Sequence, residues 1–133
     1  MAKKFLYINR KAPYGTIYAL ESLEVVLIGA AFEQDVSLAF IDDGVYQLMN
    51  GQDTAGTGVK NFSRTYKALG DYDVKKLYVE RESLDERGLT LEDLMPITYE
   101  DENEDYAEKP SIHLVSRAEM VGIIAGQDVI LSF

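Results

Sequence analysis

Short, mostly apolar runs alternate with helical stretches along the chain. Within these runs the apolar residues do not alternate with polar ones, as they would in a strand with one solvated face. Strands buried on both faces are typical of parallel sheets covered by helices on both sides. The pattern therefore predicts an α/β fold with three layers, α/β/α, around a mostly parallel sheet. The expected strands are 5–8, 36–41, 74–79, 97–99 and 129–133, and the expected helices are 16–32, 62–69, 83–87 and 116–125, with one helical turn over 45–49.

The length and the charge of the chain limit its class. Its 133 residues are the size of one domain, and we expect a single domain over residues 1–133. The net charge of −10 disfavours direct contact with nucleic acid or with an anionic membrane surface. The longest apolar run, 25–32, is far shorter than the ~20 residues of a membrane-spanning helix. The run 5–8 is too short for the core of a signal peptide, so we expect a cytoplasmic protein.

The chain contains no cysteine, and this absence removes whole classes of chemistry. It excludes disulfides, thiolate metal sites, iron–sulfur ligation and any thiol nucleophile or persulfide on this chain. The single histidine, His113, leaves only one candidate imidazole base. Because no nucleophile-elbow glycines accompany the nearby Ser111 and Ser116, we interpret His113 as a surface or interface residue.

Ligands of open parallel sheets bind beyond the carboxyl ends of the strands. The expected ends are 9–15, 42–46, 80–83 and the loop after Tyr99. The first loop lacks the closely spaced glycines of a dinucleotide site. Asp42 and Asp43 could bind magnesium, but a strand-ending turn with Gly44 is the simpler interpretation. The residues thus predict no catalytic group, no metal and no cofactor, and leave a binding or assembly module.

Two further segments are candidate contact surfaces. The segment 100–108 holds six acids in nine residues, which is typical of a solvated loop, although a docking site for a basic partner stays open. In the helix expected over 16–32, the main apolar stripe should pack on the sheet, whereas Val25 falls almost opposite it and Ile28 lies on its edge. Val25 and Ile28 are therefore our candidate subunit interface, with a scattered exposed valine as the alternative.

Several segments in this order resemble the DsrF/TusC family of the DsrE-like group. The resemblance covers nearly the whole chain, and 41–52 is its most specific part. It is carried by 12–16, 41–48, 66–73, 83–89 and 128–133. It implies a flavodoxin-like, mostly parallel sheet of five strands. It also implies a cytoplasmic hetero-hexamer that contains two copies each of this subunit and of related DsrE-type and DsrH-type subunits.

The same resemblance implies a role in sulfur transfer. Such complexes pass a persulfide on a cysteine of the DsrE-type subunit to a small acceptor protein, either for the oxidation of stored sulfur or for 2-thiolation of the tRNA wobble uridine. In the sulfur-carrying relatives the cysteine stands eight residues before the glycine of an Arg-Gly pair. Here that pair is Arg87-Gly88, and the position falls on Glu80. A carboxylate cannot hold a persulfide, so we expect a non-catalytic subunit in which Glu80 caps the following helix.

Two alternatives remain open at this point. One is the equivalent subunit of a tRNA-thiolation relay. The other, from a different class, is a stand-alone module that binds a small ligand or a flavin.

Overall fold

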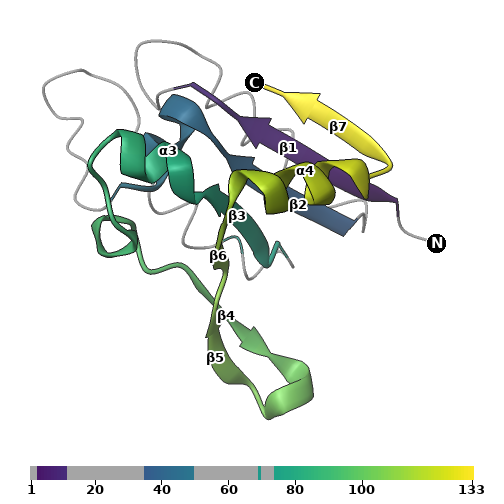
Figure 1. Ribbon diagram of the computed structural model, residues 1–133. Coiled ribbons are helices and arrows are strands. Elements are labelled where there is room, and N and C mark those ends of the chain that lie inside the picture. Colours follow the sequence, from purple (N-terminus) through teal and green to yellow (C-terminus); the bar gives the residue numbers. More distant parts are fainter. Residues whose placement is uncertain (1–2, 12–34, 50–68, 70–73) are drawn as a thin grey trace, which may run out of the picture.

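The computed structural model describes residues 3–11, 35–49, 69 and 74–133 (Figure 1). A five-stranded sheet forms its centre, with the strand order β6-β3-β2-β1-β7. All four neighbouring pairs are parallel, which confirms the predicted sheet. The strands are β1 (Lys4–Asn9), β2 (Asp35–Phe40), β3 (Lys76–Glu80), β6 (Ile112–Val115) and β7 (Val129–Ser132).

In the described part of the chain, two α-helices and three 3-10 helices accompany the sheet. Figure 1 shows α4 lying across one face of it. Both the start and the end of α4 agree with the prediction, because Ser116 and Glu119 form a reciprocal capping box and Gly126 is the C-cap. The helices are η1 (Asp42–Leu48), α3 (Arg81–Glu86), η3 (Leu91–Asp93), η4 (Glu102–Glu104) and α4 (Arg117–Ala125). None of the helices in the described ranges is long and apolar enough to cross a membrane.

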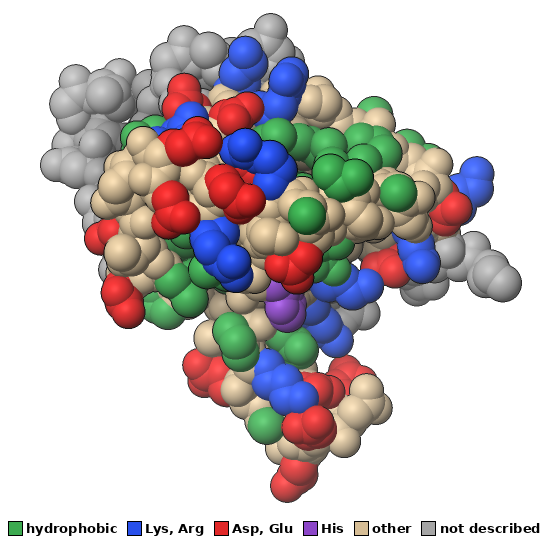
Figure 2. All heavy atoms as spheres, viewed as in Figure 1, with side chains coloured by type: hydrophobic (Ala, Val, Ile, Leu, Met, Phe, Trp, Pro, Cys, Tyr) green, Lys and Arg blue, Asp and Glu red, His purple; other side chains and the backbone are tan. Residues whose placement is uncertain are grey.

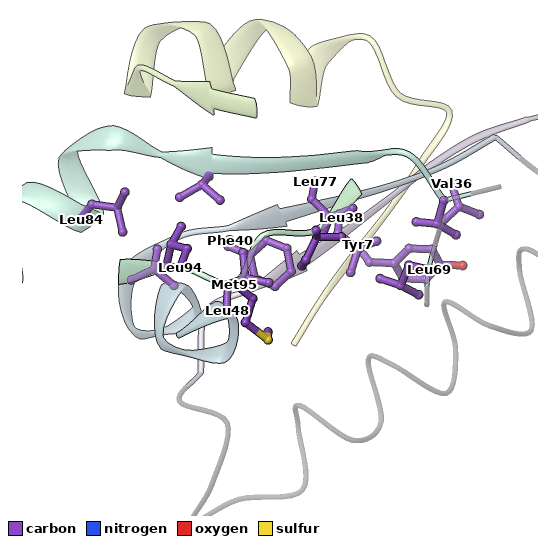
Figure 3. Close-up of a cluster of buried hydrophobic side chains, with 14 residues drawn as sticks. Tyr7, Val36, Leu38, Phe40, Leu48, Leu69, Leu77, Leu84, Leu94 and Met95 are labelled. Carbon is purple, nitrogen blue, oxygen red and sulfur yellow. The ribbon is translucent and has the colours of Figure 1, made fainter. Parts of the chain in front are cut away.

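Apolar side chains are buried on both faces of the sheet, as expected for strands without polar alternation. Because successive residues of a strand point to opposite faces, Tyr7 joins one cluster while Leu6 and Ile8 join the other. The larger cluster, drawn in Figure 3, also contains Phe40, Leu77 and the side chains that η1 and α3 contribute. The smaller cluster lies under α4 and includes Val115 and Met120.

The fourth strand of the sheet is the main correction to the prediction. We expected it at 97–99, but β6 occupies that place and pairs with β3. Instead, β4 (Thr98–Asp101) pairs with β5 (Ala107–Pro110) in a separate antiparallel hairpin. Figure 1 shows this hairpin projecting away from the sheet, so the acidic segment 100–108 is a hairpin rather than an open loop. β6 reads Ile-His-Leu-Val, and its exposed His113 interrupts the apolar run that would have identified it as a strand.

Smaller differences concern the ends of elements. The strand expected over 74–79 is Lys76–Glu80, and the turn expected over 45–49 begins earlier, at Asp42. The helix expected over 83–87 is Arg81–Glu86, and Gly88 follows it with a φ of 67°, a left-handed conformation that glycine adopts readily. The helices expected over 16–32 and 62–69 lie outside the described residues, except Leu69, which is fully buried.

Candidate functional site

The carboxyl ends of the five parallel strands meet at one edge of the sheet, where ligands of such folds bind. Asn9 ends β1, Phe40 ends β2, and Glu80 ends β3. Val115 ends β6, so the fourth of these ends lies before Ser116 and not after Tyr99 as expected. The polar side chains of α3 and of the start of α4 are anchored at this edge.

Glu80 lies at the end of β3 and is almost completely buried, with 5% of its surface exposed. Its Oε1 accepts a hydrogen bond of 2.8 Å from the hydroxyl of Ser83, which is fully buried. The same Ser83 hydroxyl accepts a bond of 2.9 Å from the backbone N–H of Asp42. One serine therefore joins the end of β3 to the start of η1.

The predicted capping role of Glu80 is only half right. Glu80 does occupy the N-cap position of α3, but its side chain accepts no hydrogen bond from a backbone N–H of that helix. Its carboxylate turns instead to the Ser83 hydroxyl and to a guanidinium. A charged partner forms stronger hydrogen bonds with a carboxylate than a neutral amide does, which explains this choice.

Arg117 supplies that guanidinium. Its Nη2 lies 3.0 Å from Glu80 Oε1 and 3.2 Å from Glu86 Oε1, and its Nε lies 3.3 Å from Glu80 Oε1. Hydrogen bonds to Glu80 and then to Glu86 raise the pKa of Arg117. The backbone N–H of Arg117 donates to both oxygens of Glu82 at 2.9 and 3.0 Å, and this bond lowers the pKa of the Glu82 carboxyl. Residues of α3 and the first residue of α4 thus form one connected network.

This network limits the chemistry that the edge can perform. The Glu80 oxygen that faces the guanidinium already accepts bonds from two side chains. A carboxylate held in this way is neither a soft nucleophile nor a persulfide carrier. Among the residues that the structure describes, no three His, Cys, Asp or Glu side chains are grouped as metal ligands would be. The geometry is that of a structural junction between two helices and the sheet.

The Asp42-Asp43-Gly44 sequence forms the start of η1, in agreement with the predicted turn. Asp42 has a φ of 49°, a left-handed conformation that aspartate tolerates better than most residues. Asp43 Oδ1 lies 3.1 Å from Nη2 of Arg87, so this carboxylate is held in an ion pair. A Cβ atom added to Gly44 would lie 1.8 Å from the backbone oxygen of Asn9. Only glycine fits at this position because η1 and the end of β1 are in direct backbone contact.

The remaining predicted residues are placed as follows. His113 lies on β6 with its side chain exposed and its ring centroid 5.8 Å from that of Tyr78, in agreement with a surface position. Val25 and Ile28, the candidate subunit interface, lie outside the described residues. The sequence reasoning missed Ser83 and Arg117. A cation in the first turn of a helix is disfavoured by the helix dipole, so Arg117, directly after the Ser116 cap, could have indicated a nearby carboxylate.

Comparison with known proteins places the chain in a family. The profile of the DsrE/DsrF-like family matches residues 3–133. The chain belongs to this family. Over 133 residues, it is 54% identical to the intracellular sulfur oxidation protein DsrF of Allochromatium vinosum, covering 100% of this chain and 98% of that protein.

Other relatives of this DsrE/DsrF-like chain extend the comparison. A TusC homologue of Vibrio vulnificus is 32% identical over 127 residues, which is 96% of each chain. The crystal structure of the ychN protein from Escherichia coli matches with a TM-score of 0.74 over 98% of this chain and 99% of that one. Its sequence identity of 18% shows a shared fold only.

Proposed function

We propose that this chain is a non-catalytic subunit of a cytoplasmic, heteromeric sulfur-transfer complex that acts in the oxidation of stored sulfur. The observation that carries this proposal is the combination of 54% identity to a sulfur oxidation protein with the complete absence of cysteine. A persulfide relay needs a thiolate on the carrier. A chain without one contributes to the relay by holding other subunits in place.

The partners we propose are related DsrE-type and DsrH-type subunits in a hetero-hexamer with two copies of each, and a small sulfur-acceptor protein reached through that complex. Glu80 takes the position that the carrier cysteine has in related subunits. Its burial and its bonds to Ser83 and Arg117 support a structural use of this position. Direct contacts with nucleic acid or with a membrane are not part of the proposal.

The second candidate function is the equivalent subunit of a sulfur relay for tRNA wobble-uridine 2-thiolation. The similarity to TusC homologues over almost the whole chain favours it as an alternative. The two relays differ in the proteins that surround this chain. Isolation of the chain from its own cells, followed by mass spectrometry of what co-purifies, discriminates between them, since the other subunits and the acceptor identify the relay.

Intact-mass measurement on the isolated complex tests the proposal itself. After incubation with polysulfide, we expect a cysteine-bearing partner to gain sulfur while the mass of this chain is unchanged. A monomer that co-purifies with a chromophore would contradict the proposal and favour a flavin-binding or small-ligand module. A sulfur adduct on this chain would also contradict it.

The proposed interface at Val25 and Ile28 has its own test. A charge at Val25 on an open surface should cost about 0.5 kcal/mol or less. Within a packed interface, the same unpaired charge would be desolvated at a cost of roughly several kcal/mol. We therefore expect Val25→Asp to fold normally by circular dichroism but to elute in gel filtration without its partners. Co-elution with the partners at dilute concentration would contradict the assignment of Val25 to the interface.

A further inference from the structure

An apolar groove of about 440 Å³ lies where the β4–β5 hairpin leaves the body of the molecule. Its walls come from the segment around η3, from β4 and β5, and from the start of β6. Hydrogen bonds fix the backbone beneath it, from Met95 N–H to Leu48 O at 2.8 Å and from Ser111 N–H to Ile97 O at 2.9 Å. The lining residues that remain exposed are Leu91, Glu92, Pro96 and Pro110. Leu91 exposes 48% of its surface, so an apolar side chain is accessible in the wall of the groove.

The hairpin extends one wall of this groove with negative charge. In its register, Thr98 pairs with Pro110 and Glu100 pairs with Glu108. Directly paired residues of an antiparallel hairpin point to the same face, and pairs two residues apart share that face. Because Thr98 and Pro110 line the groove, the side chains of Glu100 and Glu108 lie on the same face as the groove. Figure 2 shows acidic side chains gathered on the projecting hairpin.

These two carboxylates differ from the acids on the other face of the hairpin. There, Lys109 Nζ lies 2.7 Å from Asp101 and 2.9 Å from Glu104. Among the described residues, neither Glu100 nor Glu108 has an ion pair or a side-chain hydrogen bond. Like charges directly opposite each other on paired strands destabilise the pair. The arrangement is unfavourable for the isolated chain, and a positively charged partner would relieve it.

Glu92 adds a third carboxylate, since it lines the groove itself. The surface therefore combines an apolar groove with one carboxylate in its wall, Glu92, and two on the adjoining face of the hairpin, Glu100 and Glu108. We propose that this groove binds a segment of a partner protein in which an apolar side chain is flanked by lysine or arginine. The apolar side chain would cover Leu91 and the two prolines, and the basic residues would face Glu92, Glu100 and Glu108. This docking surface is independent of which relay the chain serves.

A labelled peptide tests the proposal on the full chain. The probe is a fluorescein-labelled nonapeptide with two central leucines between two pairs of lysines, and binding is followed by fluorescence anisotropy. We expect saturable binding below about 1 mM that weakens several-fold between about 50 and 300 mM salt. Replacement of the lysines by glutamates, or of the leucines by serines, should abolish saturation in the same concentration range.

Two variants locate the site, each with a matched control. Leu91→Ser should weaken the binding of the peptide about fivefold, and so should the double change Glu100→Gln with Glu108→Gln. Val121→Ser, at an exposed valine on α4, should leave affinity unchanged. So should the double change Asp85→Asn with Glu119→Gln, which removes the same charge from α3 and α4 and keeps the capping box with glutamine. All four changed proteins are checked for folding by circular dichroism.

Several results would overturn the proposal. They are the absence of saturable binding, equal binding of the serine peptide, and an equal loss in the charge-matched control, which would indicate attraction to the overall negative charge. Concentration-dependent self-association that the peptide reverses would also overturn it, because the occupant would then be a second copy of this chain. If one site variant unfolds, the other still decides the location.

Discussion

The carboxyl edge of the sheet and the projecting hairpin use their charges in opposite ways. At the edge, Glu80 is buried and bonded to Ser83 and Arg117, and Asp43 is paired with Arg87. On one face of the hairpin, Glu100 and Glu108 are directly opposite each other. The acidic side chains of this protein therefore have two separate uses. Among the described residues, the carboxylates of Glu80 and Asp43 at the edge are held by internal bonds, whereas the hairpin leaves the charges of Glu100 and Glu108 available to a partner.

The largest expected effect comes from Gly44, which holds the edge together by direct backbone contact. Gly44→Ala places a Cβ atom 1.8 Å from Asn9 O, so the backbone of η1 or β1 must move. We expect the free energy of unfolding to fall by about 3 kcal/mol, measured by urea denaturation. Gly122→Ala is the control, because its Cβ meets nothing within 4 Å and alanine favours the helix by about 0.5–1 kcal/mol. Equal stability of the Gly44→Ala protein and the wild type would contradict the direct backbone contact between Gly44 and Asn9.

A smaller effect is expected from Arg117, which connects the two helices to Glu80. Arg117→Met leaves the Glu80 carboxylate buried with Ser83 as its remaining side-chain partner. The Arg117 side chain is 56% exposed and the ion pair is partly screened by water, so we expect Tm to fall by a few degrees rather than by the larger amount expected for a fully buried pair. In a Glu80→Gln background the fall in Tm should be smaller, since no charge is then left unpaired. An equal fall in the two backgrounds would contradict a direct interaction.

The hairpin should show the smallest effects on stability, with opposite signs on its two faces. Asp101→Asn removes one of the two carboxylate partners of Lys109 and should lower Tm by about 2 °C, whereas Glu108→Gln relieves repulsion and should raise Tm by about 1 °C. The hydrogen bond from Lys109 lowers the pKa of Asp101. The stabilisation by Asp101 is therefore present above its ordinary pKa of 3.8 and is lost as the pH falls below it. Both Tm values are measured by thermal denaturation at pH 7. A change of Tm with the same sign in both variants would contradict opposite contributions of the two faces to stability.

The central sheet and the caps of α4 could be predicted from local sequence, but the hydrogen bonds and ion pairs that join Glu80, Ser83 and Arg117 could not. β1, β2 and β7 are predicted to within one residue at most ends because each is a nearly continuous apolar run. β6 was missed because His113 interrupts its short apolar run, and because its pairing with β3 joins residues more than 30 positions apart in the sequence. The bond between Glu80 and Arg117 joins residues 37 apart. Only the unfavourable position of the Arg117 cation at the start of α4 could have indicated this bond.

In the proposed function, the carboxyl edge of this chain is structural and sulfur transfer takes place on a partner subunit. The most direct measurement is the rate of sulfur transfer by the assembled complex with Glu80→Gln in place of the wild-type chain. We expect normal assembly by gel filtration and a transfer rate within about twofold of the wild type, because Glu80 contacts no transferred atom in this account. A loss of about tenfold or more with intact assembly would correspond to at least 1.4 kcal/mol of lost transition-state stabilisation. That result would show that Glu80 takes part in the chemistry.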